Sequence, residues 1–312
     1  MTHLSEKIIH EHLVRKTAKQ KAAFRKTLIE EMNAMSVEAH EEKSGGLISS
    51  VNVVIGDAEK AEMIFGAHYD TAPRMIVPNF ITPRNPLVYI LYQLLVVVGM
   101  LIPAIALSAP VGLYLSKEAG KLVWFAVYCG LLALMIKGPA NPNTFNDNTS
   151  GVVALIELME RMPEGLRSRC AFVFFDNEEL GMVGSSAFRA KHKRVKDVPM
   201  VNMDCVGDGE HLLLASAKAF RADARLYGAL QAAFETRGPV LDVKAETTVY
   251  PSDQMGFRKS LAMASLKKAR IIGYYMDRIH TAKDTVLCPE NIHRVAEGLA
   301  EMAGRYLDNR AE

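Results

Sequence analysis

The chain has 312 residues, 49% of them hydrophobic and 23% charged, which is enough for one large domain or two ordinary ones. Its formal net charge of +2 argues against nucleic-acid binding, which needs a concentrated basic surface. The four cysteines, Cys129, Cys170, Cys205 and Cys288, lack Cys-x-x-Cys spacing. This excludes a zinc finger and a disulfide framework, and favours free thiols in a reducing compartment.

The N-terminal part of the chain predicts a long amphipathic helix within residues 1–40, because apolar residues recur there at helical spacing. Its basic residues are interpreted as the solvated face of that helix, with attraction to an anionic membrane surface as a second interpretation. They are Arg15, Lys16, Lys19, Lys21, Arg25 and Lys26. The N-terminal residues 1–16 contain no apolar run of signal-peptide length, so no secretory signal is expected.

Strand-like and helix-like segments alternate along the rest of the chain. Strands are expected in residues 51–56, 62–70, 171–176, 201–207, 211–216 and 261–266, and helices in residues 150–162, 220–236 and 289–307. The continuous apolar run AFVFFD is typical of a central strand buried on both faces. This order predicts an α/β fold: a doubly wound, mostly parallel mixed sheet with helices on both faces.

A long apolar insertion interrupts this pattern at residues 73–137, between residues 1–72 and 138–312. Residues 87–107 form a run of 21 residues in which only Gln93 is polar, long enough to cross a bilayer core. A second apolar run, residues 122–136, spans about 22 Å as a helix, short of the ~30 Å core. Together they predict an inserted helical hairpin.

Acidic residues and histidines gather where the expected strands end. His68 and Asp70 are two apart at one strand end and so point to the same side. Asp147 precedes a helix, Glu178 and Glu179 follow the buried strand, Asp204 is in or at the end of another strand, and His280 precedes the last helix. Each alone has an ordinary structural explanation. Together they form a set of nitrogen and oxygen ligands suited to divalent cations such as zinc.

Six motifs in this order resemble those of one enzyme family: GAHYD, NDNTSG, NEELGMVGS, NMDCVG, PSDQMGF and IHTAKDT, within residues 66–285. The chain resembles the dinuclear-zinc aminopeptidases of the bacterial leucyl aminopeptidase and aminopeptidase Y type, in the zinc exopeptidase superfamily. The resemblance implies the zinc-dependent exopeptidase fold for residues 1–72 and 138–312. It also implies a metallopeptidase that removes N-terminal residues of peptides with a metal-activated water.

The resemblance also implies a role for each motif residue. Asp147 would bridge two divalent cations, expected to be Zn²⁺; His68 and Asp204 would complete one site, and Glu179 and His280 the other. Asp70 would orient the His68 ring, and Glu178 would be the general base. Relatives have a cis peptide bond after the bridging aspartate, which predicts one between Asp147 and Asn148.

This sequence departs from the family pattern at several positions. Ile279 precedes His280 where some relatives have a tyrosine, and Gln254 follows Asp253 where His or Tyr is frequent. The residues proposed as substitutes for that tyrosine are Tyr250, Tyr274 and Tyr275. Cys205 is interpreted as a core residue, whereas His10, His12 and His192 are expected to be solvated.

Two alternative functions are a catalytically inactive receptor on the same fold and a glutaminyl-cyclase-like acyltransferase. The complete ligand set argues against both.

The hairpin separates His68 from Asp147, which must meet at one metal pair. Its two ends are therefore expected to lie close together, and a true span requires an even number of membrane crossings. The leading interpretation is a cell-membrane protein with a cytoplasmic catalytic domain. The alternative is a soluble cytoplasmic homo-oligomer formed through residues 80–137. The length of the first run favours the membrane, and the short second run favours the oligomer.

Overall fold

The computed structural model describes residues 1–35, 37–46 and 48–308 of the chain. Within these residues the strands form one nine-stranded mixed sheet in the order β1-β2-β4-β3-β5-β8-β6-β7, with β9 paired to β8. The strands are β1 Ala39–Ser44, β2 Ser50–Ile55, β3 Met63–His68, β4 Cys170–Phe175, β5 Met200–Met203, β6 His211–Ser216, β7 Val240–Lys244, β8 Ser260–Ala269 and β9 Gly273–Tyr275. The neighbours β4, β3, β5 and β8 are parallel and form the centre.

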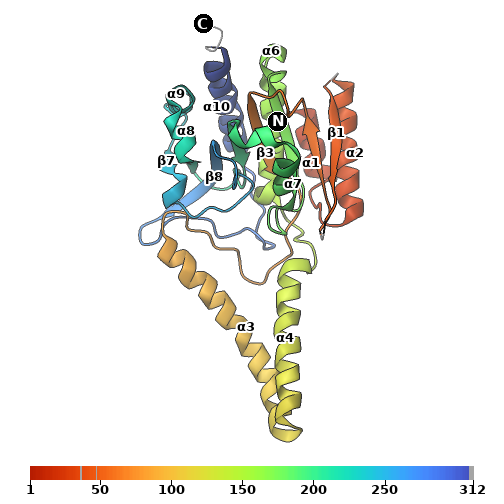
Figure 1. Cartoon of the computed structure of the whole chain (residues 1–312). Coiled ribbons are helices and arrows are strands. Elements are labelled where there is room, and N and C mark those ends of the chain that lie inside the picture. Colours follow the sequence, from red (N-terminus) through yellow and green to blue (C-terminus); the bar gives the residue numbers. More distant parts are fainter. Residues whose placement is uncertain (36, 47, 309–312) are drawn as a thin grey trace.

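Helices cover both faces of the sheet (Figure 1). They are α1 His3–Glu11, α2 Ala18–Ala34, α3 Pro86–Tyr114, α4 Lys117–Lys137, α5 Gly151–Arg161, α6 Glu164–Arg167, α7 Val183–Lys191, α8 Lys218–Ala222, α9 Ala224–Phe234 and α10 Pro289–Asp308; a π-helical turn, η1, spans Phe145–Ser150. Alternate residues of β3 enter opposite cores: Phe65 packs in the same cluster as residues of α5 and α10, and Ile64 packs with Phe188 of α7. The predicted α/β fold is confirmed.

The prediction of one helix within residues 1–40 is wrong. Two helices, α1 and α2, are followed by β1, which pairs with β2. Thr17 starts α2 with a capping box, in which its hydroxyl accepts from the Gln20 N–H and the Gln20 side chain accepts from the Thr17 N–H. Between the helices Arg15 is fully buried. Residues 12–17 lie outside both helices, and there Arg15 donates to the Tyr69 carbonyl oxygen.

The basic residues of this segment are not one solvated face. Arg15 and Arg25 are buried, and Lys21 donates to Asp176 at 2.6 Å. Arg25 donates to Glu41 at 2.7 Å and to the Tyr69 hydroxyl at 3.0 Å. These side chains point toward acidic and carbonyl groups around the sheet, because charged groups near a protein interior need partners.

The insertion forms a hairpin of α3 and α4 that projects from the sheet domain (Figure 1). By their residue counts the helices are about 44 and 32 Å long. The second helix is longer than the apolar run suggested, because lysines at both its ends are helical. Both helices are long and apolar enough to cross a membrane, and only 11% and 6% of their most apolar windows are buried. In this chain alone they are therefore not core helices.

The two ends of the insertion lie side by side, as predicted. Pro73 pairs with Ala140 in an isolated bridge, and Arg74 N–H donates to Pro139 O at 2.8 Å. Residues 73–85 then cross the loop after β9, which carries His280, before α3 begins at Pro86. In that crossing Met75 N–H donates to His280 O at 2.7 Å, and Ile81 pairs with Met276. The base of the hairpin is thus joined to the segment that carries His280.

Candidate metal centre

The five predicted ligand residues meet at one edge of the sheet. His68 is the last residue of β3, Asp204 follows β5, and Glu179 lies in the loop after β4. Because β3, β4 and β5 are parallel neighbours, their carboxyl ends meet there, the usual place for a site in such sheets. Asp147 in η1 and His280 in the loop after β9 complete the group.

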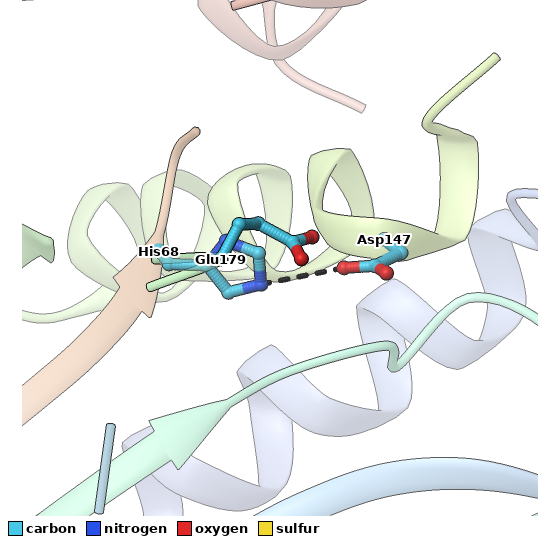
Figure 2. Close-up of side chains that lie close together, drawn as sticks. All are labelled: His68, Asp147 and Glu179. Carbon is cyan, nitrogen blue, oxygen red and sulfur yellow. Dashed lines mark ion pairs between the residues drawn. The ribbon is translucent and has the colours of Figure 1, made fainter. Parts of the chain in front are cut away.

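Asp147 lies between the two histidines. One of its carboxylate oxygens is 3.3 Å from His68 Nε2, and the other is 3.0 Å from His280 Nε2. His68 Nε2 is also 3.5 Å from Asp204 Oδ1, and His280 Nε2 is 3.4 Å from Glu179 Oε2. Figure 2 shows His68, Asp147 and Glu179 turned toward one another. The groups therefore fall into two halves that share Asp147.

The donor set fits divalent cations. Ligand atoms of His68, Asp147 and Glu179 all lie within 4.8 Å of one another. Among the described residues, Glu179 Oε1 and Asp204 Oδ1 are buried without a hydrogen-bond partner. Buried polar atoms without partners are costly, and imidazole nitrogen with carboxylate oxygen is a zinc-type ligand set.

Burial and crowding of carboxylates shift the pKa values in the site. Desolvation raises the pKa of Glu178 well above its usual value, and nearby carboxylates such as Glu179 add to the rise. Desolvation also raises the pKa of Glu179, to about 8. Burial alone would lower the pKa of His280, but the Glu179 and Asp147 carboxylates outweigh it and raise it to about 9. The site thus concentrates negative charge that favours cations.

Asp70 connects the end of β3 to the glutamate loop. Its carboxylate accepts from the backbone N–H of Glu178 at 2.9 Å and of Glu179 at 3.2 Å. Its Oδ1 also lies 3.5 Å from His68 Nδ1. Asp70 therefore faces the imidazole nitrogen opposite the one that faces Asp147, so it is placed to orient the ring.

The turn that carries Asp147 is held by buried polar groups. Asp284 accepts from the backbone N–H of Asn146 at 2.8 Å and of Asp147 at 3.0 Å. The Asn148 side chain accepts from Gly151 N–H and donates to Met203 O. The Asp147–Asn148 peptide bond is cis, which confirms that prediction.

Three residues around the site were not assigned roles from the sequence: Asp284, Asp253 and Arg15. Asp284 lies in the motif IHTAKDT and Asp253 in the motif PSDQMGF, so these motifs could have pointed to both residues. Asp253 is fully buried, and burial raises its pKa to about 7, while the nearby Ser185 hydroxyl opposes the rise. Arg15 had no such signal, because its neighbours in sequence are basic and read as solvated.

The remaining predictions near the site have mixed outcomes. Cys205 is buried, as predicted, although its sulfur lies within 4.8 Å of ligand atoms of Asp147 and Asp204. Burial raises the pKa of its thiol well above the usual value, which disfavours the thiolate that binds metal. Tyr250, one of the residues proposed as a substitute for the tyrosine of the relatives, donates its hydroxyl proton to Asp204 O.

The prediction that His192 is solvated is wrong. Its side chain is buried, with Nδ1 2.5 Å from Glu59 Oε1 and Nε2 2.9 Å from Glu42 Oε1. Glu42 of β1 and Glu59 in the loop between β2 and β3 hold the ring at the end of α7, which the local sequence does not reveal.

Comparisons with known proteins support the fold and the family. A Zn-dependent exopeptidase from Parabacteroides distasonis has 14% identity and a TM-score of 0.57, with 98% of this chain and 96% of that chain covered. The LapA aminopeptidase of Legionella pneumophila has 14% identity and a TM-score of 0.57, with 97% and 69% covered. The glutaminyl cyclase of Porphyromonas gingivalis has 16% identity and a TM-score of 0.56, with 98% and 96% covered. At these identities the likeness shows the fold alone.

No curated protein sequence matches the chain. The model of peptidase family M28 matches residues 135–303, more than half of the chain and including Asp147, Glu179, Asp204 and His280. The chain belongs to peptidase family M28.

Proposed function

We propose that the chain is a metal-dependent exopeptidase, and specifically an aminopeptidase of the leucyl aminopeptidase and aminopeptidase Y type. The observation that carries the proposal is the cluster of two histidines and three carboxylates in which Asp147 lies between His68 and His280. His68, Asp147 and Asp204 would hold one divalent cation, and Asp147, Glu179 and His280 a second. Zn²⁺ is the expected ion, because the ligands are nitrogen and oxygen.

Two bound cations would supply Lewis acidity, lowering the pKa of a water and polarising a peptide carbonyl. The protein's own contribution is proton transfer by Glu178. Desolvation holds the pKa of its carboxyl well above the usual value, which suits a group that accepts a proton from the attacking water. Glu178 then donates that proton to the leaving amine. Asp70 keeps the loop in place by accepting the Glu178 N–H.

The proposal predicts a clear result in a peptide-library digestion combined with metal analysis. The wild-type protein should release single N-terminal amino acids. Glu178→Gln should lower kcat by about 10²–10⁴-fold with the metal content unchanged. Glu164→Gln, at an exposed position, is the matched control and should be fully active. Metal-replete wild-type protein that hydrolyses none of the library would contradict the proposal.

The second candidate is a glutaminyl-cyclase-like acyltransferase. The fold likeness to the Porphyromonas gingivalis glutaminyl cyclase, which covers 96% of that chain, favours this second candidate. A peptide with N-terminal glutamine separates the two functions. An aminopeptidase releases free glutamine, whereas a cyclase gives a peptide of almost unchanged mass that has lost ammonia. A catalytically inactive receptor would do neither, but this chain retains the whole ligand set and Glu178.

We also propose that two parts of the chain have different roles. Residues 1–72 and 138–312 would form the catalytic domain, and residues 73–137 a hairpin inserted in the cell membrane, with the catalytic domain on the cytoplasmic side. Most large hydrophobic side chains exposed among the described residues lie on α3 and α4, including Leu95, Ile102 and Leu122. An apolar surface of this extent requires lipid or a partner. The alternative is a homo-oligomer through residues 80–137.

A further inference from the structure

The two arms of the hairpin enclose an apolar cavity on the side of the catalytic domain. In Figure 1, α3 and α4 are closest at the tip and separate toward the base. The cavity measures about 590 Å³, a size typical of ligand sites. Its walls include Val96, Gly99 and Met100 of α3 and Leu131 and Leu134 of α4.

A second cavity shares part of the wall of this one and lies beside the loop that carries His280. Arg74, Met75 and Ile76 line it, and the same three residues line a second cavity of about 420 Å³ together with Thr281 and Lys283. Thr281 follows His280 directly in the chain. Met75 N–H also donates to His280 O at 2.7 Å, so the shared wall is joined to a residue of the candidate site.

The chemistry of the walls differs between the two cavities. Near His280 the side chains of Arg74 and Lys283 carry donors, which suit the carbonyl oxygens of an extended main chain. Between the helices the walls are almost entirely aliphatic side chains, methionines and prolines, which offer little to a polar group. A polar segment placed there would lose its hydrogen bonds to water, whereas an apolar one gains from burial.

We propose that the apolar cavity is an extended substrate subsite, occupied by apolar residues of the peptide that lie beyond the bond to be cut. This proposal rests on the proposed exopeptidase function, which requires the rest of the peptide to leave the site past the rim. The substrate class is then peptides with an apolar segment close to the N-terminus, the kind of segment that partitions into a membrane. The hairpin holds that apolar segment while the first residue of the peptide lies at the metal centre.

Two glycines give a matched pair of variants to test the subsite. Gly99 lines the cavity and Gly130 does not, and a Cβ atom added at either position meets no atom within 4 Å. Gly99→Phe should therefore fill the cavity without disturbing the helix, and Gly130→Phe is its control. Leu131→Trp, from the opposite helix, gives a second way to fill the same space.

The substrates are two peptides of equal length and charge that share their first three residues and differ in an apolar or a polar tail. In micelles, the wild type should have a kcat/KM about tenfold or more higher for the apolar tail, since one buried leucine supplies that much. Gly99→Phe and Leu131→Trp should remove this preference and leave the polar peptide unchanged. Gly130→Phe should match the wild type.

Binding of the same peptides with a reduced, uncleavable first bond tests the subsite without turnover. Tail-dependent binding that Gly99→Phe abolishes supports the subsite even if no peptide is hydrolysed, in which case only the exopeptidase proposal fails. The subsite proposal is overturned if the tails bind equally, or if Gly99→Phe and Gly130→Phe behave alike. A cavity permanently filled by lipid would give that second result.

Discussion

Asp284 is the buried carboxylate that holds the turn beneath Asp147. It accepts two consecutive N–H groups, those of Asn146 and Asp147, so it fixes the direction in which the Asp147 carboxylate points. Asp284→Ala should weaken metal binding about 10–100-fold, the usual effect of losing a group that orients a ligand. Zn²⁺ titration calorimetry measures this. Asp277→Ala, which removes only a partly exposed partner of Lys267, is the control. Unchanged affinity in a folded Asp284→Ala protein would remove Asp284 from this role.

Arg15 joins the N-terminal segment to the site. Its guanidinium donates to the backbone carbonyls of Tyr69 and His12 and to the Thr149 hydroxyl. Arg15→Met removes the donor from the buried Tyr69 carbonyl oxygen, so we expect a loss of about 2 kcal/mol or more in the free energy of unfolding. Urea denaturation measures it. Lys19→Met, at an exposed position, should stay within about 0.5 kcal/mol of the wild type.

The contrast between Asp147 and Arg15 explains how much of the site was predictable. Asp147, His68 and the other motif residues are recognisable because strand ends and helix starts place them locally, and parallel strands bring those ends together. Arg15 lies 54 residues from its partner Tyr69 and 134 from Thr149. Local periodicity carries no information about such contacts, so its burial appears only in the folded chain.

At the scale of elements, the hairpin depends on a close contact between glycines near its tip. A side chain at Gly120 would meet the Gly112 Cα at 2.7 Å and the Ser108 carbonyl oxygen at 3.2 Å. These are backbone atoms, which cannot move aside as a side chain can. Gly120→Val should therefore separate α3 from α4 and destabilise the hairpin by about 1–3 kcal/mol.

Thermal melting followed by Trp124 fluorescence measures this change, because the chain's single tryptophan is in α4. Gly130→Val is the matched control, since it adds the same β-branched side chain to the same helix where nothing lies within 4 Å. Equal melting temperatures for the two variants would show that the glycine contact does not hold the hairpin.

The prediction of helices and strands succeeded where the residues of a segment fitted one type of element and failed where they fitted two. β3 and β4 are buried along their whole length, so their apolar runs identified them. β1, in contrast, has the sequence AHEEKS, whose polar residues resemble the end of a helix. It is a strand because its edge pairs with β2, a contact that its own residues do not signal.

At the scale of the whole molecule, the base of the hairpin is joined to the loop that carries His280. The bridge between Pro73 and Ala140 closes the insertion at its base. The segment from Pro73 to the start of α3 contacts the loop that carries His280. A membrane-bound hairpin would therefore keep the rim of the site at the surface from which apolar peptides arrive. A soluble oligomer would instead cover the same helices with copies of the chain.

The fluorescence of Trp124 distinguishes these two arrangements. Trp124 is only partly buried in the single chain and stacks on Tyr128, with ring centroids 5.3 Å apart. If the hairpin enters a bilayer, adding phospholipid vesicles should shift its emission to shorter wavelength, and brominated lipids should quench it. Replacing residues 87–136 with a flexible Gly-Ser linker should leave a folded protein that no longer sediments with vesicles. If the lipid-free protein is already oligomeric, with emission that vesicles do not change, residues 80–137 form a subunit interface and the membrane proposal is wrong.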